Sequence, residues 1–391
     1  MDAATPATGT SAIGTSVIGT SPSGASPAAS APLADRTPMG RRELVRLVLV
    51  LVALTVALRL PAFFVDVFNS DETFLATQAQ VVADGGDLYR EAADRKPPLV
   101  PYVYAATFAV FGTNELWSVR VAAMGAVALT ALLLAFEAQR RYGRRAAWIA
   151  GLLCVFGSVA FAPQDGQAAN FEIFMLPAMT AAVLLARRGR PAGSGVGVAL
   201  ATLAKQTGVL TLLPVLYLIG RAQGRRGLVR ALVGFAVPIG VAAAVVGPRR
   251  LINWTVLGNG SYVSSETAST VVLGMFLVMS LAWAACNAPA LWRLPVAWRA
   301  RREPDLDGGH DIDLWLWLAS AAVSVMIGLR FFGHYYLQLL PPVALLAASA
   351  LTKSSRLIRI GSLVLAGIMA LGFSVAGYFL QPLAASPSTS G

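Results

Sequence analysis

The sequence predicts an all-α polytopic membrane protein. Of its 391 residues, 56% are hydrophobic and only 13% are charged, whereas soluble domains carry about 25% charged residues. The mean hydropathy is +0.64. Apolar runs of membrane-spanning length recur along the chain, and short arginine-rich clusters separate them. These observations indicate that lipid is the main solvent of the chain.

Spanning helices are expected at a series of apolar runs: 44–64, 116–136, 146–163, 171–186, 231–247, 271–290, 314–330, 336–350 and 360–380. A further apolar stretch, 196–220, is interrupted by Lys205 and Gln206. We interpret it as two short helices that meet at this break, because one straight helix would need no polar residues there. The sequence therefore predicts about eleven transmembrane helices.

The basic clusters determine the expected topology. They occupy positions 41–42, 140–145, 187–190, 221–230, 293–302 and 353–359. All six lie on one side of the membrane if 97–113 does not cross it and 196–220 crosses it twice. The positive-inside rule makes that side cytoplasmic. The N-terminus is then inside and the C-terminus outside, with outer loops at 65–113, 164–170, 248–270 and 330–335.

Three regions are expected along the chain. Residues 1–40 are rich in Ala, Thr, Ser, Gly and Pro and are predicted to form a disordered cytoplasmic tail. They lack a basic segment followed by an apolar core, so we do not expect a signal peptide. Residues 41–380 form the transmembrane domain, whose 65–113 loop carries interfacial helices, and 381–391 form a short tail.

The composition also argues against two other classes of protein. The net charge of +11 comes from short arginine clusters between apolar runs, which is typical of membrane topology and not of nucleic-acid binding. Cys154 and Cys286 both lie in apolar runs without metal-ligand spacing. Neither a disulfide framework nor a zinc site is therefore expected.

An acidic motif follows the first expected helix. Asn69, Ser70, Asp71 and Glu72 precede an amphipathic stretch at 74–82. In one interpretation Ser70 caps a helix whose first turn contains the two acids. In the other, one carboxylate faces a cavity at the membrane surface and accepts a proton from a hydroxyl group.

A basic motif with the sequence DRKPPL occupies residues 94–99. Its two prolines set a rigid approach to the apolar stretch 99–111. Lys96 is expected at the level of the lipid headgroups. There it either snorkels to the interface or places a point charge on a lipid phosphate.

A second acidic motif, DGQAANFE, runs from Asp165 to Glu172. It is either a polar turn capped by Asn170 or the source of a second carboxylate in the same cavity. Arg59, near the end of the first helix, is a candidate ion-pair partner for one of the acids of these loops.

Two further groups of polar residues lie at membrane depth or near it. Lys205 stands inside an apolar run, where an ionisable residue is costly and its default interpretation is functional. Arg330, His334, Tyr335 and Tyr336 follow the 314–330 helix. They can bind a phosphate or diphosphate headgroup, or the tyrosines can belong to the aromatic belt.

These motifs follow one another in a set order: Asp71-Glu72 after the first helix, Lys96-Pro97-Pro98-Leu99 before Phe111-Gly112 and Arg120, Lys205 in LATLAKQTGVL, and His334-Tyr335-Tyr336 before Leu340-Pro341-Pro342. In this order, from about Arg41 to Leu380, the chain resembles the GT-C superfamily of membrane glycosyltransferases. The resemblance is to the protein-mannosyltransferase and aminoarabinose-transferase branch, glycosyltransferase family 39 and its kin.

The resemblance implies a GT-C-like helical bundle with a helical first extracytoplasmic loop, a polyprenyl-phosphate-linked sugar donor and a cavity at the outer membrane face. It also implies that Asp71 is the catalytic acid/base and that Lys96 helps to bind donor phosphate. Many relatives carry an acid followed by proline where this chain has DGQAANFE. The candidate site residues are, as catalytic acids, Asp71 and Glu72; as second carboxylate, Asp165 or Glu172; and as phosphate ligands, Lys96, Lys205, Arg330, His334 and Tyr335.

The predicted function is transfer of a hexosyl or pentosyl group, with inversion, at the outer face of the cell (plasma) membrane. The acceptor is a glycan, a lipid or a protein, and a divalent cation is left open. One alternative is a transporter or flippase of a lipid-linked glycan, although many transporters carry an internal repeat that this sequence lacks. A non-catalytic membrane scaffold is the third alternative.

Overall fold

The computed structural model describes residues 38–258 and 269–379, which all belong to the compact unit Pro32–Gly391. The predicted tails, 1–40 and 381–391, lie outside the described residues except for positions 38–40. Within the described ranges the regular structure is helical, apart from one isolated β-bridge between Leu88 and Ala92. The predicted all-α class is confirmed.

The first half of the chain supplies these elements: α2 (Arg41–Arg59), η2 (Leu60–Phe64), α3 (Ser70–Ala83), α4 (Leu99–Phe111), α5 (Leu116–Tyr142), α6 (Arg144–Gly157), α7 (Pro163–Gln167), α8 (Phe171–Arg187) and α9 (Pro191–Ala204). The second half supplies η3 (Gln206–Thr211), α10 (Leu212–Val246), α11 (Pro248–Ile252), the π-helical turn η4 (Asn253–Leu257), α13 (Ser269–Cys286), α14 (Ala288–Leu291), α15 (Leu294–Arg299), α16 (Ile312–Ile327), η5 (Gly333–Leu339), α17 (Leu340–Thr352) and α18 (Arg356–Phe379).

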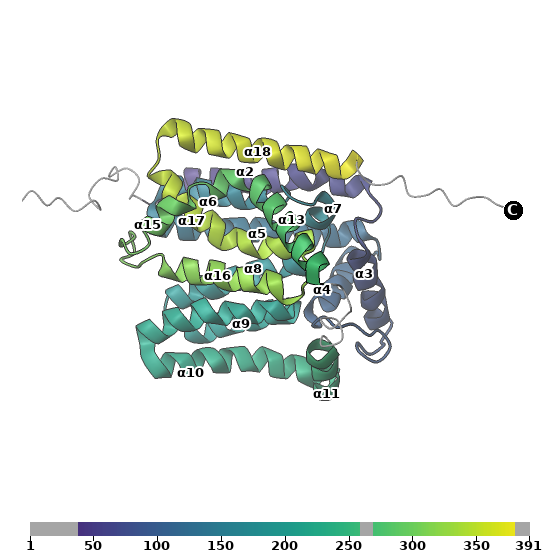
Figure 1. Ribbon diagram of the computed structural model, residues 1–391. Helices are drawn as coiled ribbons and strands as arrows, with labels where there is room; N and C mark the ends of the chain where they lie inside the picture. The colour runs from purple at the N-terminus through teal and green to yellow at the C-terminus, as the bar shows by residue number, and fades with distance from the viewer. Residues whose placement is uncertain (1–37, 259–268, 380–391) are drawn as a thin grey trace, which may run out of the picture. The chain divides into compact units, whose positions relative to one another are not determined.

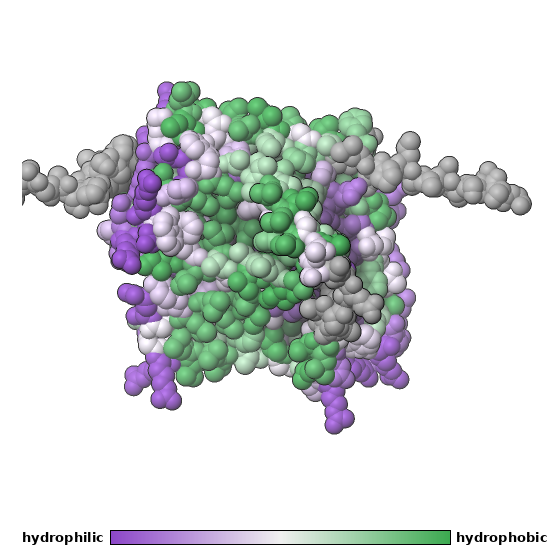
Figure 2. All heavy atoms as spheres, viewed as in Figure 1, coloured by the Kyte–Doolittle hydropathy of each residue, from purple (hydrophilic) through white to green (hydrophobic). Residues whose placement is uncertain are grey.

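Most of the long helices run along a common direction, whereas α3 and α4 gather at one end of the bundle (Figure 1). On the face shown, hydrophobic residues form a broad band across the middle, and hydrophilic residues concentrate toward the two ends of the bundle (Figure 2). Helix α17 lies in the interior, and each of its residues from Leu340 to Leu351 is buried. This distribution is typical of a helical bundle embedded in lipid.

Six helical segments among the described residues are long and apolar enough to cross a membrane: Arg41–Phe64, Leu116–Tyr142, Gln206–Val246, Ser269–Cys286, Gly333–Thr352 and Arg356–Ala376. Shorter apolar helices, Leu99–Phe111, Pro191–Ala204 and Ile312–Ile327, accompany them. The predicted count of about eleven spans is therefore not confirmed. Helix α4 has only 13 residues, fewer than the roughly 20 that a spanning helix needs, which agrees with the expectation that 97–113 does not cross.

The helix break predicted at Lys205 is present. Helix α9 ends at Ala204, Lys205 is extended with φ −151° and ψ 133°, and η3 begins at the next residue. A second break follows inside α10 at Gly224, whose φ of 57° is a left-handed conformation that glycine adopts without steric cost. The apolar stretch 196–220 therefore contributes to two helices.

The six basic clusters meet at one end of the bundle. Five contacts connect them: Arg144–Glu43 at 3.1 Å, Arg140–Asp307 at 3.2 Å, Arg188–Glu137 at 3.3 Å, Lys353–Glu303 at 2.7 Å, and Gln223 Nε2 to the Gly189 carbonyl at 2.7 Å. This common location is what the topology derived from the basic loops requires. We call this end the basic end.

A cluster of buried ion pairs lies behind the basic end. Arg141, at the end of α5, is 1% exposed and pairs with Glu137 at 3.0 Å, Asp311 at 3.4 Å and Asp313. Arg187, on α8, also reaches Glu137 at 3.6 Å and Asp313 at 3.5 Å. Buried charges are tolerated only when they are paired, so this cluster holds α5, α8 and α16 in fixed register.

Candidate active site

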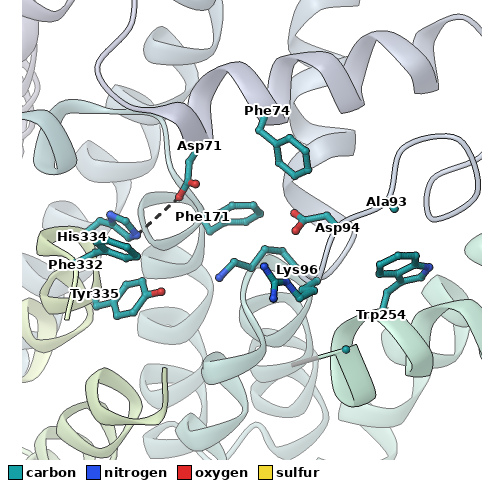
Figure 3. A pocket seen from close by; sticks show the side chains of 12 residues that line it. Asp71, Phe74, Ala93, Asp94, Lys96, Phe171, Trp254, Phe332, His334 and Tyr335 are labelled. Atoms are coloured by element: carbon teal, nitrogen blue, oxygen red, sulfur yellow. Dashed lines mark ion pairs between the residues drawn. The ribbon is translucent and has the colours of Figure 1, made fainter. Parts of the chain in front are cut away.

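A cavity of about 530 Å³ lies at the end of the bundle that carries α3, α4 and α11. Its lining residues are Asp71, Phe74, Ala93, Asp94, Arg95, Lys96, Phe171, Trp254, Gly258, Phe332, His334 and Tyr335 (Figure 3). They come from three of the predicted outer loops, 65–113, 248–270 and 330–335, and from the residue that follows the fourth. Segments that are far apart in the sequence therefore converge on one polar cavity.

Asp71 reaches the cavity because of how α3 begins. The helix cap is Asn69 and not Ser70: the Asn69 side-chain oxygen accepts hydrogen bonds from the backbone N–H groups of Asp71 at 3.1 Å and Glu72 at 3.4 Å. Ser70 becomes the first helical residue. The Asp71 side chain is 38% exposed and lines the cavity.

Glu72 points to a different environment, as expected for neighbours about 100° apart on a helix. Its carboxylate is fully buried and accepts hydrogen bonds from Arg120 Nη2 at 2.7 Å and Arg120 Nε at 3.1 Å. It also accepts from the backbone N–H groups of Phe68 at 3.1 Å and Ala169 at 2.9 Å. Each carboxylate oxygen thus has two donors, and Glu72 is not among the cavity-lining residues.

Arg120 and Glu72 together form a clamp between helices, which we call the Arg120 clamp. Beyond Glu72, the Arg120 guanidinium donates to the backbone carbonyls of Ala62 at 2.5 Å, Val65 and Asp66 at 3.0 Å. The Arg120–Glu72 pair therefore ties α5 to η2 and to the start of α3. It fixes the position from which Asp71 enters the cavity.

Lys96 enters the cavity from the segment between the β-bridge and α4. Tyr89 fixes the backbone of this segment, since its hydroxyl donates to the Lys96 carbonyl at 2.6 Å. The Lys96 ammonium lies 5.7 Å from the centre of the Phe171 ring. Arg95 and Asp94 line the same wall. Burial raises the pKa of the Asp94 carboxyl above its ordinary value, and the neighbouring Gln78 and Lys96 offset only part of this effect.

His334 sits between three carboxylates. Its Nδ1 lies 3.1 Å from Asp165 Oδ1, and its Nε2 lies 3.9 Å from Asp71 Oδ2 and 4.0 Å from Glu172 Oε1. The ion pair with Asp71 spans the cavity wall (Figure 3). Burial acts to raise the pKa of Asp165, but His334, the Gly333 backbone N–H and the Asn69 side chain together outweigh it and leave that pKa below its ordinary value.

Glu172 and Lys205 form a buried ion pair beneath the cavity. Asn170 caps α8, which was one of the two interpretations of this motif, because its side chain accepts from the Ile173 N–H at 3.3 Å. The Lys205 ammonium also lies 3.5 Å from the centre of the Tyr335 ring. Tyr335 lines the cavity, whereas Lys205 and Glu172 are not among the lining residues. Lys205 therefore contacts the lining of the cavity only through Tyr335 among the described pairs.

Arg59 and Arg330 were both expected to serve the site, and neither has the predicted place among the lining residues or ion pairs described. Arg59 pairs with no acid among the described residues; it donates to the backbone carbonyls of Ser158 at 3.3 Å and Gly166 at 2.8 Å. The pairing predicted for it is wrong, because unsatisfied carbonyls at the turn between α6 and α7 compete for the guanidinium. Arg330 is not among the residues that line the cavity.

Aromatic rings are the part of the site that sequence reasoning missed. Phe74, Phe171, Phe332 and Trp254 all line the cavity. Trp254 belongs to the π-helical turn η4, and its indole N–H donates to the Tyr89 carbonyl at 3.2 Å. Its place in a predicted outer loop was the available signal, since an aromatic residue in such a loop needs a surface to pack on.

The fold and the site together define a polytopic helical membrane protein with a charged cavity at one end of its bundle. Residues 95–252 match the family described as dolichyl-phosphate-mannose-protein mannosyltransferase. No curated protein sequence matches the chain. The resemblance to the GT-C superfamily of membrane glycosyltransferases is confirmed by this match and by similar solved structures.

One similar structure is ArnT from Cupriavidus metallidurans bound to undecaprenyl phosphate, with a TM-score of 0.60, 16% identity and coverage of 86% of this chain and 75% of that one. The same protein in the apo state gives a TM-score of 0.58 with 16% identity and the same coverage. The Archaeoglobus fulgidus oligosaccharyltransferase in complex with Zn and sulfate gives 0.55, with 14% identity and coverage of 85% of this chain and 53% of that one. The chain therefore has the GT-C fold.

Proposed function

We propose that the chain transfers a sugar from a polyprenyl-phosphate-linked donor to an acceptor hydroxyl group. The observation that carries this proposal is the shared cavity, in which the Asp71 carboxylate, the Lys96 and Arg95 cations and several aromatic rings meet. A base, a phosphate-binding group and an apolar wall are what such a reaction needs. A protein of similar fold has been solved with undecaprenyl phosphate bound.

The donor phosphate is proposed to bind Lys96 and Arg95. An ammonium supplies a compact point charge, and a guanidinium a planar fork that matches phosphate oxygens. The polyprenyl tail stays in lipid, so the phosphate is delivered at the membrane boundary. Lys205 neutralises Glu172 and supports Tyr335, and its contribution to donor binding is indirect.

The sugar is proposed to occupy the remaining space between Phe74, Trp254 and Asp94. A volume of about 530 Å³ lies within the range of small-molecule sites, about 300–1,000 Å³. The rings offer apolar faces to the C–H surface of a sugar. The Asp94 carboxyl can accept a hydrogen bond from a sugar hydroxyl, and hydroxyl groups that are recognised in this way give strong discrimination.

The proposed reaction is a single displacement at the anomeric carbon. The acceptor oxygen attacks this carbon, the bond to the phosphate oxygen breaks, and polyprenyl phosphate leaves with the bonding electrons. Asp71 takes the acceptor proton. Lys96 and Arg95 stabilise the charge that develops on the leaving phosphate. A single displacement inverts the anomeric configuration, and Asp71 is favoured over Glu72 as the base because Arg120 already neutralises Glu72.

The proposed reaction takes place at the outer face of the plasma membrane. The support is the position of the six basic clusters, which gather at the basic end, while the cavity lies among the predicted outer loops. The positive-inside rule assigns the basic end to the cytoplasm.

A strain that lacks the gene tests the function. We expect surface glycans that lack one sugar and an accumulated polyprenyl-phosphate sugar, both measured by mass spectrometry and both restored by the wild-type gene but not by an Asp71→Asn variant. If the protein were instead a transporter or flippase, the Asp71→Asn variant would also restore the surface glycans of this strain. Unchanged glycans and unchanged lipid-linked sugars in the strain would overturn the proposal.

A further inference from the structure

His334 occupies a place in the cavity wall that differs from that of a phosphate ligand. Its imidazole edge faces carboxylates on both sides, Asp165 at Nδ1 and Asp71 with Glu172 at Nε2. Three negative groups within 4.0 Å repel a phosphate. Lys205 pairs with Glu172 beneath the cavity, and the Lys96 ammonium lies against Phe171.

We infer that His334 is a positioning residue and proton relay for Asp71, held in one tautomer by Asp165. Nδ1 lies 3.1 Å from Asp165 Oδ1, and with the proton placed on Nδ1 the Nε2 of the neutral imidazole would present its lone pair toward Asp71 and Glu172. Bound in this way, the histidine resembles the middle member of a carboxylate–imidazole arrangement, in which one nitrogen is fixed so that the other can exchange a proton.

The imidazole plane is fixed by its neighbours. The ring stacks on Phe332, with ring centres 5.6 Å apart and an angle of 18° between the planes, and meets the edge of Tyr335 at 4.9 Å. His334 is buried, with 5% of its surface exposed. These contacts fix the plane of the ring, and the 3.1 Å between Nδ1 and Asp165 Oδ1 favours the orientation in which a nitrogen faces this carboxylate.

Asp165 is itself held in place from two sides. The Asn69 side chain donates to its carboxylate at 3.4 Å, and the Asn170 side chain donates to its backbone carbonyl at 2.7 Å. The chain also approaches Asp165 closely just before His334: a Cβ added at Gly333 would lie 2.8 Å from Asp165 Oδ2. The same Cβ would come still closer to the Ala162 side chain, so the backbone before His334 packs tightly against α7 and the residue before it.

The proposed relay, which rests on the proposed transfer reaction, balances in two proton movements. The acceptor O–H proton first moves to Asp71 as the new glycosidic bond forms. The protonated Asp71 then gives this proton to Nε2, which yields an imidazolium between Asp165 and Glu172 and restores the Asp71 carboxylate. Nε2 and Asp71 Oδ2 are 3.9 Å apart, so the relay requires the part-exposed Asp71 side chain to move closer to the ring.

The tautomer can be measured without any substrate. The chain contains two histidines, His310 and His334, so a His310→Asn variant labelled with ¹⁵N-histidine gives an NMR signal from His334 alone. In lipid nanodiscs we expect Nδ1 to carry the proton in the neutral ring. Asp165→Asn should move the proton to Nε2, the tautomer that free histidine prefers. A neutral ring with Nε2–H in the parent protein would overturn the inference, whether or not transfer activity has been found.

Kinetics separate the relay from phosphate binding. His334→Asn places an amide N–H near the position of Nδ1 and keeps the partner of Asp165, but it has no group at the position of Nε2. We expect its turnover with a polyprenyl-phosphate sugar to fall about 10²-fold, at the low end of general acid–base effects, with KM for the donor unchanged. A raised donor KM with normal turnover would assign His334 to the phosphate and contradict the relay.

Discussion

Asp71 and Glu72 are adjacent acids, and the structure predicts opposite outcomes for their amide variants. Asp71→Asn keeps the size of the side chain at a position that is 38% exposed. The bond that Asn69 makes in this turn goes to the backbone N–H of residue 71 and survives the change. An amide cannot take a proton near neutral pH. Transfer should therefore fall by about 10²–10⁴-fold, the usual contribution of a positioned base, while folding and donor binding persist.

Glu72→Gln should instead lower stability. Each Glu72 oxygen accepts one bond from Arg120 and one from a backbone N–H, and the amide turns one of these acceptors into a donor. Losing one charged and one neutral hydrogen bond costs about 2–4.5 kcal/mol. That is a large fraction of the roughly 5–15 kcal/mol that stabilises a folded protein.

The assay is transfer rate and thermal unfolding of the two variants, measured side by side in the same detergent. Asp71→Asn with near-normal turnover would remove Asp71 from the mechanism. If Glu72→Gln were as stable as the wild type but inactive, the base would be Glu72, and the assignment of roles to the Arg120 clamp would be refuted.

Further predictions concern the cavity, the pH dependence and the topology. Lys96→Ala should weaken binding of a polyprenyl-phosphate sugar at least tenfold without lowering the unfolding temperature, and unchanged donor affinity would exclude Lys96 from the phosphate site. The pKa of Asp165 lies below its ordinary value, so its interactions with His334, Gly333 and Asn69 stabilise the fold above about pH 4, and this contribution is lost as the pH falls through the lowered pKa. The difference in unfolding temperature between wild type and Asp165→Asn should therefore shrink on acidification; a constant difference would contradict this. In a protein without native cysteines, Asp87→Cys should react with an impermeant reagent in intact cells and Gln223→Cys should not, and the reverse pattern would invert the topology.

Several features of the fold were predictable because they follow from the cost of charge in lipid. Lys205 marks a break in an apolar run, and the chain does end a helix there. Arginine clusters must stay out of the hydrocarbon, which places them together at the basic end and leaves the remaining polar loops to form the cavity. Both inferences need only the local sequence and the membrane as solvent.

The remaining features depend on contacts that a sequence does not display. Whether Asp71 or Glu72 faces the cavity depends on where α3 begins, and moving the cap from Ser70 to Asn69 shifts that start by one residue. The partners of Arg59 are backbone carbonyls, which every residue possesses and no motif reveals. Trp254 reaches the cavity through a π-helical turn, and no residue pattern in this chain predicts that turn.

The buried ion pairs next to the basic end affect whether the cavity can open to both sides of the membrane. A transporter must open its site alternately to both sides. An opening at the basic end would separate α5 from α16 and pull Arg141 away from Asp311 and Asp313, so it would have to replace these ion pairs with contacts to water. With the basic end held closed in this way, the proposed transfer would use the cavity end alone. Donor, acceptor and both products would share it, so the order in which they arrive and depart becomes part of the catalytic cycle.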